Sequence, residues 1–111
     1  MIEKIILDYL NETLTVPAYM EVPEKAPESY VVIEKTGSSE YNHIKEATLA
    51  IQSVAPTLYK AACLNEEVKA VMGNADILAD ITKSKCNSDY NFTDTSTKSY
   101  RYQAVYDISH Y

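Results

Sequence analysis

Glycine is scarce in this sequence, which has only Gly37 and Gly73, far apart along the chain. A phosphate-binding loop needs several glycines within a few residues, so the sequence excludes this class of nucleotide site. No apolar run approaches the roughly 20 residues needed to span a bilayer, so no membrane partner is expected. The N-terminus lacks the basic, apolar and cleavable pattern of a secretion signal, and we therefore expect synthesis in the cytosol.

Cysteine and histidine are also scarce, which removes most metal-site patterns. Cys63 and Cys86 form no CxxC motif, and in a reducing compartment they are predicted to be free thiols. His43 and His110 have no set of neighbours whose spacing would complete a metal site, so both are predicted to be surface histidines. The sequence therefore predicts no metal and no cofactor.

No motif supports catalysis. The spacing of Asn87, Asp89 and Asn91 resembles the start of a calcium-binding loop. However, Phe92 and Lys98 occupy the positions at which such a loop needs glycine and glutamate. No serine, cysteine or histidine lies in a nucleophile motif. We therefore predict that the chain is not an enzyme and has no small-molecule substrate.

Positive charge is limited, because the formal net charge is −6. Tight binding to DNA requires a basic surface, so no specific nucleic-acid partner is expected. The sequence is rich in tyrosine, with ten residues against one phenylalanine. Tyrosine combines apolar area with a hydroxyl group, which suits amphipathic sheet faces and subunit contacts. The simpler alternative is that several tyrosines only cap the edge of the core.

Hydrophobic periodicity divides the chain into helices and strands. In chain order these are helix 2–13, an edge strand within 16–23, strand 30–35, strand 44–54, helix 57–72, a strand that begins within 77–88, and strand 100–111. The order α-β-β-β-α-β-β predicts a single α+β domain over residues 1–111. We expect a mostly antiparallel sheet with both helices packed on one face. Periodicity alone also allows residues 44–54 to be helical.

The last strand has the clearest pattern in the chain. Every second residue is tyrosine or apolar, and polar residues lie between them, which predicts a long, half-buried strand. The predicted core-facing residues are Tyr100, Tyr102, Ala104, Tyr106 and Ile108. The segment Thr93–Lys98 has turn chemistry, so this strand is predicted to form a hairpin with the strand before it. Near the second helix, Pro56 fits the first turn and Gly73 fits the end.

The loop Thr36–His43 is predicted to join strands 30–35 and 44–54 as a hairpin with a long tip. This loop and the predicted loop Asn87–Lys98 carry polar and aromatic side chains without an evident role in the core. We take them as candidate protein-interface loops. The candidate interface residues are Ser38, Ser39, Glu40, Tyr41, Asn42, Asp89, Asn91 and Asp94. The alternative is that both are solvated loops without a partner.

Several segments resemble those of a known family. They are Tyr30–Ser38, Ala47–Ser53 and Asn87–Asp94, the last leading into Tyr100–Tyr106. Together with the tyrosine-rich terminal hairpin and the predicted order of elements, they resemble the tail-terminator (tail-completion) proteins of long-tailed bacteriophages and prophages. The resemblance covers most of the chain.

That resemblance implies a structural role. Members of the family form a ring, commonly a hexamer, on the head-proximal end of the tail tube. The ring ends tube polymerisation and docks the head connector. The implied partners are further copies of this chain, the tail-tube protein and the connector or neck proteins. The implied location is the host bacterial cytoplasm during assembly and then the virion tail. The alternatives are another head–tail joining protein, a small non-catalytic ligand-binding or regulatory domain, or an enzyme with no recognisable motif.

Overall fold

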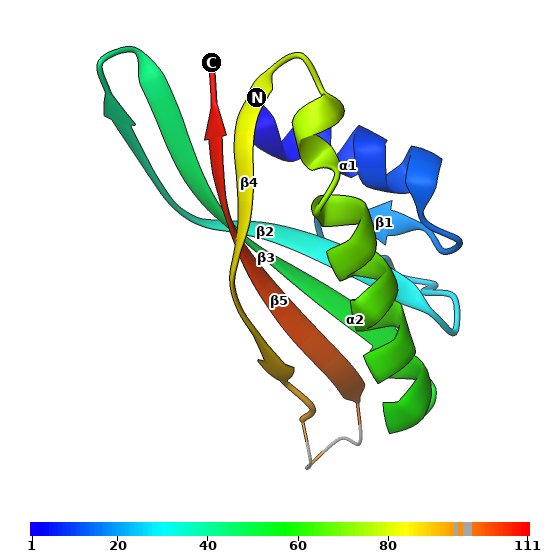
Figure 1. The fold of residues 1–111 in the computed structure, drawn as a ribbon. Coiled ribbons are helices and arrows are strands. Elements are labelled where there is room, and N and C mark those ends of the chain that lie inside the picture. The colour runs from blue at the N-terminus through cyan, green and yellow to red at the C-terminus, as the bar shows by residue number, and fades with distance from the viewer. Residues whose placement is uncertain (95, 97–98) are drawn as a thin grey trace.

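The computed structural model describes residues 1–94, 96 and 99–111. Its elements are α1 (Ile2–Thr13), β1 (Ala18–Tyr19), β2 (Tyr30–Tyr41), β3 (Ile44–Ala55), α2 (Leu58–Met72), the short 3-10 helix η1 (Ala75–Ile77), β4 (Ile81–Asn91) and β5 (Tyr100–His110). The predicted α+β class and the order α-β-β-β-α-β-β are confirmed (Figure 1). Residues 95, 97 and 98 of the predicted turn lie outside the described residues.

The strands form one sheet in the order β1-β2-β3-β5-β4. Its pairs are antiparallel, except that β1 lies parallel to β2. The predicted edge position of the first short strand is confirmed, since β1 pairs with β2 alone. Both helices lie on one face, as predicted: α1 contacts β1 and β2, and α2 contacts β3, β4 and β5 (Figure 1).

The core fills the space between the helices and this face of the sheet. Its largest fully buried apolar side chains are Ile6, Leu10, Val31, Ile33, Leu49, Ile51, Val68, Met72 and Ile108. In β5 the period-two prediction is confirmed for Ala104, Tyr106 and Ile108, which are buried, whereas Tyr100 and Tyr102 are half-buried. Tyr106 and Ile108 lie in the same apolar cluster as α1 and α2. The terminal strand is therefore part of the core.

The second helix starts one residue later than predicted. Thr57 is its N-cap, and the Thr57 hydroxyl accepts a hydrogen bond from the Lys60 N–H at 3.1 Å. Pro56 therefore precedes the cap rather than lying in the first turn. Leu58 in the first turn is exposed, and the packed stripe of the helix begins one turn later at Ala61. The helix ends at Gly73, as predicted.

The predicted hairpin between the strands that begin at 30 and 44 is confirmed, but its predicted long loop Thr36–His43 is wrong. Strand β2 continues to Tyr41, and only Asn42 and His43 separate it from β3. Both turn residues have positive φ, 49° and 67°, which is the backbone of a tight hairpin turn. Gly37 and the serines after it suggested a break, but cross-strand pairing with β3 holds them extended. The only irregularity of this ladder is a bulge at Thr36.

The first five residues of the predicted loop Asn87–Lys98 belong to a strand instead. Strand β4 runs to Asn91, so Asp89 and Asn91 are strand residues that pair with Ala104 and Tyr102. A bulge at Asn87 shifts the alternation of side chains. This shift explains why the sequence pattern suggested a loop. Beyond the strand, Asp94 forms an isolated antiparallel bridge with Ser99.

Candidate assembly surface

The clearest surface feature is a hairpin that projects from the body of the molecule. We define the arm as residues 34–46, which form the outer halves of β2 and β3 and are exposed throughout. In Figure 1 the arm extends past the helices, and neither helix covers it. The molecule is accordingly elongated, with extents of 44 × 25 × 25 Å. The tip of the arm, residues 41–44, lies beyond the pairing of β3 with β5 and is two-stranded. A two-stranded ribbon has little core of its own, so the surface of the tip is available for another molecule.

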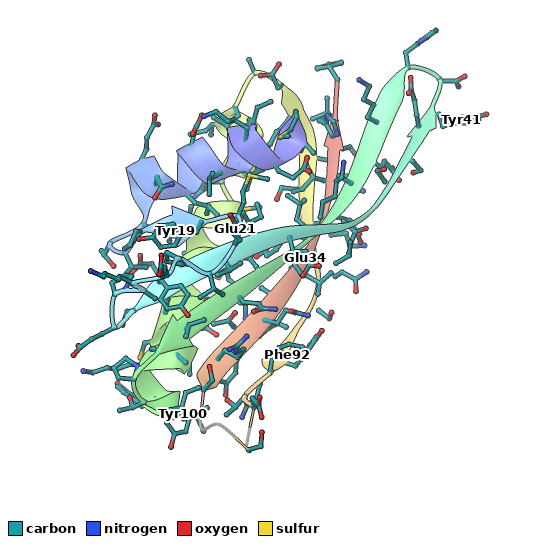
Figure 2. The ribbon with its side chains drawn as sticks, turned by 180° about the vertical axis from the view of Figure 1, so that it is seen from behind. Tyr19, Glu21, Glu34, Tyr41, Phe92 and Tyr100 are labelled. Carbon is teal, nitrogen blue, oxygen red and sulfur yellow. The ribbon has the colours of Figure 1, made fainter. Side chains whose placement is uncertain are left out.

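The tip of the arm carries two exposed apolar side chains. Tyr41 and Ile44 are cross-strand partners on one face of the ribbon, and they are 80% and 43% exposed. Figure 2 shows Tyr41 at the far end of the arm, away from the rest of the labelled residues. We call Tyr41 and Ile44 the knob. Large apolar groups that are exposed together often mark a contact surface.

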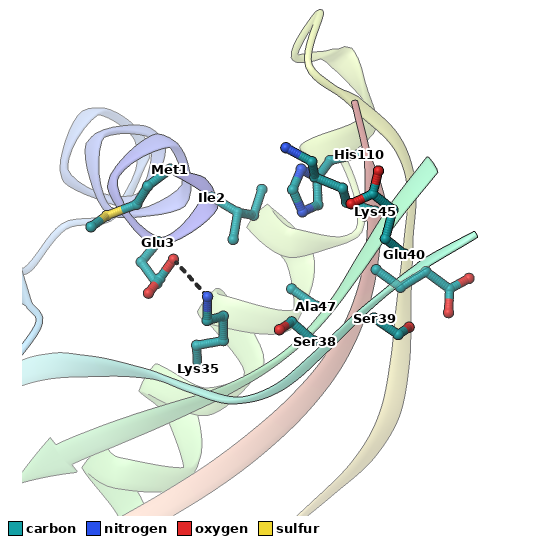
Figure 3. A pocket seen from close by; sticks show the side chains of 11 residues that line it. Met1, Ile2, Glu3, Lys35, Ser38, Ser39, Glu40, Lys45, Ala47 and His110 are labelled. Carbon is teal, nitrogen blue, oxygen red and sulfur yellow. Dashed lines mark ion pairs between the residues drawn. The ribbon is translucent and has the colours of Figure 1, made fainter. Parts of the chain in front are cut away.

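The base of the arm is attached to α1. Lys35 forms an ion pair with Glu3 of α1 at 3.7 Å (Figure 3). Beside this pair lies an open groove of about 390 Å³ between the start of α1 and the arm. The pairing of β3 with β5 extends only to Lys45, which lies opposite His110. The ion pair therefore holds the base of the arm on the β2 side, β5 borders the arm on the β3 side as far as Lys45, and only residues 41–44 form a two-stranded ribbon.

The structure brings five of the candidate interface residues together on the arm. Ser38, Ser39, Glu40 and Tyr41 are strand residues, and Asn42 lies in the turn. All five are exposed, as expected for an interface. The sequence prediction omitted Ile44, which lies opposite Tyr41 and completes the knob. It was predicted only as the first residue of strand 44–54, and the register reveals that it pairs with Tyr41 at the tip of the arm.

Asp89, Asn91 and Asp94 lie on β4 and just after it, so the structure does not bring them together with the arm residues. Asp89 faces α2: its carboxylate accepts a hydrogen bond from Asn65 Nδ2 at 3.2 Å and lies 3.4 Å from Lys69 Nζ. Asp94 accepts hydrogen bonds from the Ser96 backbone N–H and hydroxyl group. Asp89 thus links a helix to a strand and is part of the fold.

Lys69 lies between two carboxylates on this helix–strand contact. Its ammonium group is 3.3 Å from Glu66 and 3.4 Å from Asp89. The hydrogen bond to Glu66 raises the pKa of Lys69; burial opposes this increase, and Asp89 adds to it. Lys69 is therefore held in its charged form, and this arrangement stabilises the contact rather than preparing Lys69 for proton transfer.

The opposite face of the sheet carries a ladder of hydrogen-bonded polar side chains. Gln52 Nε2 donates to Gln103 Oε1 at 3.0 Å, and Gln103 Nε2 donates to the Tyr90 hydroxyl at 2.6 Å. Arg101 donates to Gln52 Oε1 at 3.1 Å. These bonds join β3, β5 and β4 side by side. No local pattern in the sequence indicates this network, because its members are far apart in the chain.

The described residues contain neither a metal-binding group of side chains nor a membrane-spanning helix. Within this part of the chain, no three or more His, Cys, Asp and Glu side chains are grouped so that they could hold a metal ion. None of the described helices is long and apolar enough to cross a membrane. Cys63 and Cys86 are both free, as predicted.

The fold and the arm together define an elongated two-layer α+β domain with a projecting hairpin. No protein-family model matches the chain, and no curated protein matches it significantly.

Proposed function

We propose that this chain is the subunit of a phage tail terminator, which caps the head-proximal end of the tail tube as a ring and docks the head connector. The observation that carries the proposal is the arm, which ends in the exposed knob Tyr41 and Ile44. The resemblance of the sequence to tail terminators indicates which assembly the chain would join. The arm supplies a physical reason for the chain to associate with a neighbour.

A ring requires two different surfaces on each subunit, one that reaches forward and one that receives. The arm is suited to the first role, because it projects from an otherwise compact body along the longest axis of the molecule. It has backbone pairing along its length and a defined turn, so its conformation costs little entropy on binding. Exposed apolar groups at its tip gain free energy when a neighbour covers them.

The charge of the chain fits a ring around a DNA channel. With a formal net charge of −6, the subunit repels phosphate, so DNA would pass through the ring without being held. The grooves on the described surface are open, with volumes of about 240 to 450 Å³. An open groove encloses a small ligand poorly, so the structure offers less support for a ligand-binding domain than for an assembly subunit.

The test is tail length in the phage or prophage that encodes the chain. Particles assembled without the chain should have overlong or headless tails in electron micrographs, and supplying the intact chain should restore normal length. In a purified system, the chain should bind the ends of tail tubes and stop their growth. Normal tails and normal infectivity without the chain would refute the proposal. Binding to the connector but not to tube ends would instead assign it to another position in the neck.

A further inference from the structure

The molecule has an apolar groove at the end opposite the knob. The groove has a volume of about 310 Å³ and is lined by apolar parts of Val16, Tyr59, Cys63 and Leu64. It lies between α2 and the segment that connects α1 to β1. Tyr59 is 78% exposed, and Cys63 is exposed as well. The apolar lining of this groove is therefore open to another molecule.

One wall of the groove is fixed in place. Glu67 of α2 accepts a hydrogen bond from the Thr15 backbone N–H at 2.8 Å and another from the Thr15 hydroxyl at 2.9 Å. These bonds tie the segment after α1 to the helix, so the wall formed by Val16 is held against α2. A groove whose walls are already in position loses little conformational entropy when it is filled.

The knob cannot fill the groove of its own molecule. Strand β3 runs from the arm tip to Ala55, just before α2 begins, and its 12 residues span about 40 Å at roughly 3.3 Å each. Figure 2 shows this separation: Tyr41 and Tyr100 lie at opposite ends, and Tyr100 is the cross-strand partner of Ala55. Contact between the knob and the groove therefore requires two molecules.

We propose that the knob of one copy inserts into the groove of the next copy, which joins the subunits head to tail. This inference rests on the proposed ring function and names the contact that builds the ring. The two surfaces differ, so the contact is heterologous, and repeating it generates a closed ring when the rotation between subunits closes. The second copy covers Tyr41 and Ile44, which no described residue of their own chain buries.

The charges beside the two surfaces are complementary. Glu46 lies two residues after Ile44, so it is on the same face of the ribbon as the knob. Lys60 lies next to Tyr59 and lines the groove. Within the described residues, neither Glu46 nor Lys60 forms an ion pair. An insertion that brings Glu46 close to Lys60 gives both charges a partner and fixes the orientation of the arm.

Cross-linking tests this contact directly, because Cys63 is already present in the groove. The variant Ile44→Cys is oxidised at millimolar chain concentration, and peptide mapping identifies the linked residues. We expect intermolecular links between positions 44 and 63, and we expect them to disappear when Cys63→Ser is added. The same variant with Ser38→Cys in place of Ile44→Cys is the control, because Ser38 lies on the other face of the arm. No link between positions 44 and 63, or equal linking from position 38, would overturn the proposal.

Charge reversal gives an independent test by sedimentation, either at high concentration or on tail-tube ends. Glu46→Lys and Lys60→Glu should each weaken association about tenfold, and combining them should restore most of it. Tyr41→Ser should weaken association by at least about tenfold. Tyr111→Ser is its control, because Tyr111 is 70% exposed but lies outside both surfaces. Absence of any rescue by the double reversal would refute the Glu46–Lys60 contact.

The outcomes separate this contact from the function. If positions 44 and 63 become cross-linked but the phage makes normal tails without the chain, the contact is supported and the terminator function is refuted. If the chain caps tube ends but positions 44 and 63 do not cross-link, the function is supported and the contact is refuted.

Discussion

Removing the Asp89 carboxylate should destabilise the protein, whereas removing the Glu40 carboxylate should not. The sequence placed both residues in polar loops, and the structure separates them. Asp89 joins β4 to α2 through Asn65 and Lys69, and Glu40 lies on the exposed arm. The pair of substitutions therefore tests the helix–strand contact against a matched carboxylate that has no structural role in the described fold.

The magnitude follows from two interactions. Asn65 is only 1% exposed, so Asp89→Ala leaves its amide N–H group buried without an acceptor, at a cost of about 1–3 kcal/mol. The Lys69 and Asp89 side chains are 30% and 32% exposed, so their ion pair contributes only about 0–1 kcal/mol. We expect a total loss of about 2 kcal/mol for Asp89→Ala and less than about 0.5 kcal/mol for Glu40→Ala.

Urea unfolding followed by far-UV circular dichroism measures both values at neutral pH. Asp89→Asn separates the two interactions, since its amide oxygen still accepts from Asn65 while the charge is lost; it should cost about 0–1 kcal/mol. For a domain of this size, 2 kcal/mol corresponds to a melting temperature lower by roughly 8 °C. Equal stability of the Asp89→Ala and Glu40→Ala variants would refute this account of the contact between α2 and β4.

Three further predictions concern the core, the turn and the terminal strand. Burial, with Cys86 nearby, raises the pKa of Tyr106 above its ordinary value of 10.0. The unfolded chain therefore loses the Tyr106 hydroxyl proton at lower pH than the folded chain, so the free energy of unfolding falls as pH rises above 10. Urea unfolding at about pH 8 and about pH 11 measures this fall, and the fall should be smaller in Tyr106→Phe. His43→Gly should raise the free energy of unfolding by about 0.5–1 kcal/mol, because φ at this position is 67° and glycine adopts positive φ without the steric cost of a side chain. A lower free energy of unfolding in the same assay would contradict this. Deleting residues 100–111 should abolish cooperative melting in calorimetry. Each buried apolar side chain contributes about 1.5–3 kcal/mol, so losing several exceeds the usual free energy of unfolding. A transition like that of the intact chain would show that β5 is peripheral to the core.

The elements that bury apolar side chains could be predicted from sequence. Helical spacing in residues 2–13 and alternation in residues 100–108 are local patterns that follow directly from which side chains face the core. Strand β3 was predicted for the same reason, through Ala47, Leu49 and Ile51, all of which are buried. For these segments the local pattern and the tertiary packing agree.

The arm could not be predicted in this way, because its residues bury nothing. Without apolar periodicity, Gly37, Ser38 and Ser39 suggested a loop, and pairing with β3 decided their conformation instead. The turn Asn42–His43 also lacks the Asn-Gly signature of a two-residue hairpin.

The role of Asp89 could not be predicted for a different reason. Its partners Asn65 and Lys69 lie on α2, and only the fold brings them close.

The polar ladder on the open face of the sheet also determines which residues of neighbouring strands pair. A slip of two residues between β3 and β5 would keep every apolar side chain on the core face, so the hydrophobic pattern alone does not forbid it. Such a slip would separate Gln52 from Gln103 and break their hydrogen bond, and a slip between β5 and β4 would likewise separate Gln103 from Tyr90. The ladder therefore selects one alignment among several that bury the same face. Because β2 is aligned on β3, the same side chains fix how far Tyr41 projects beyond the body.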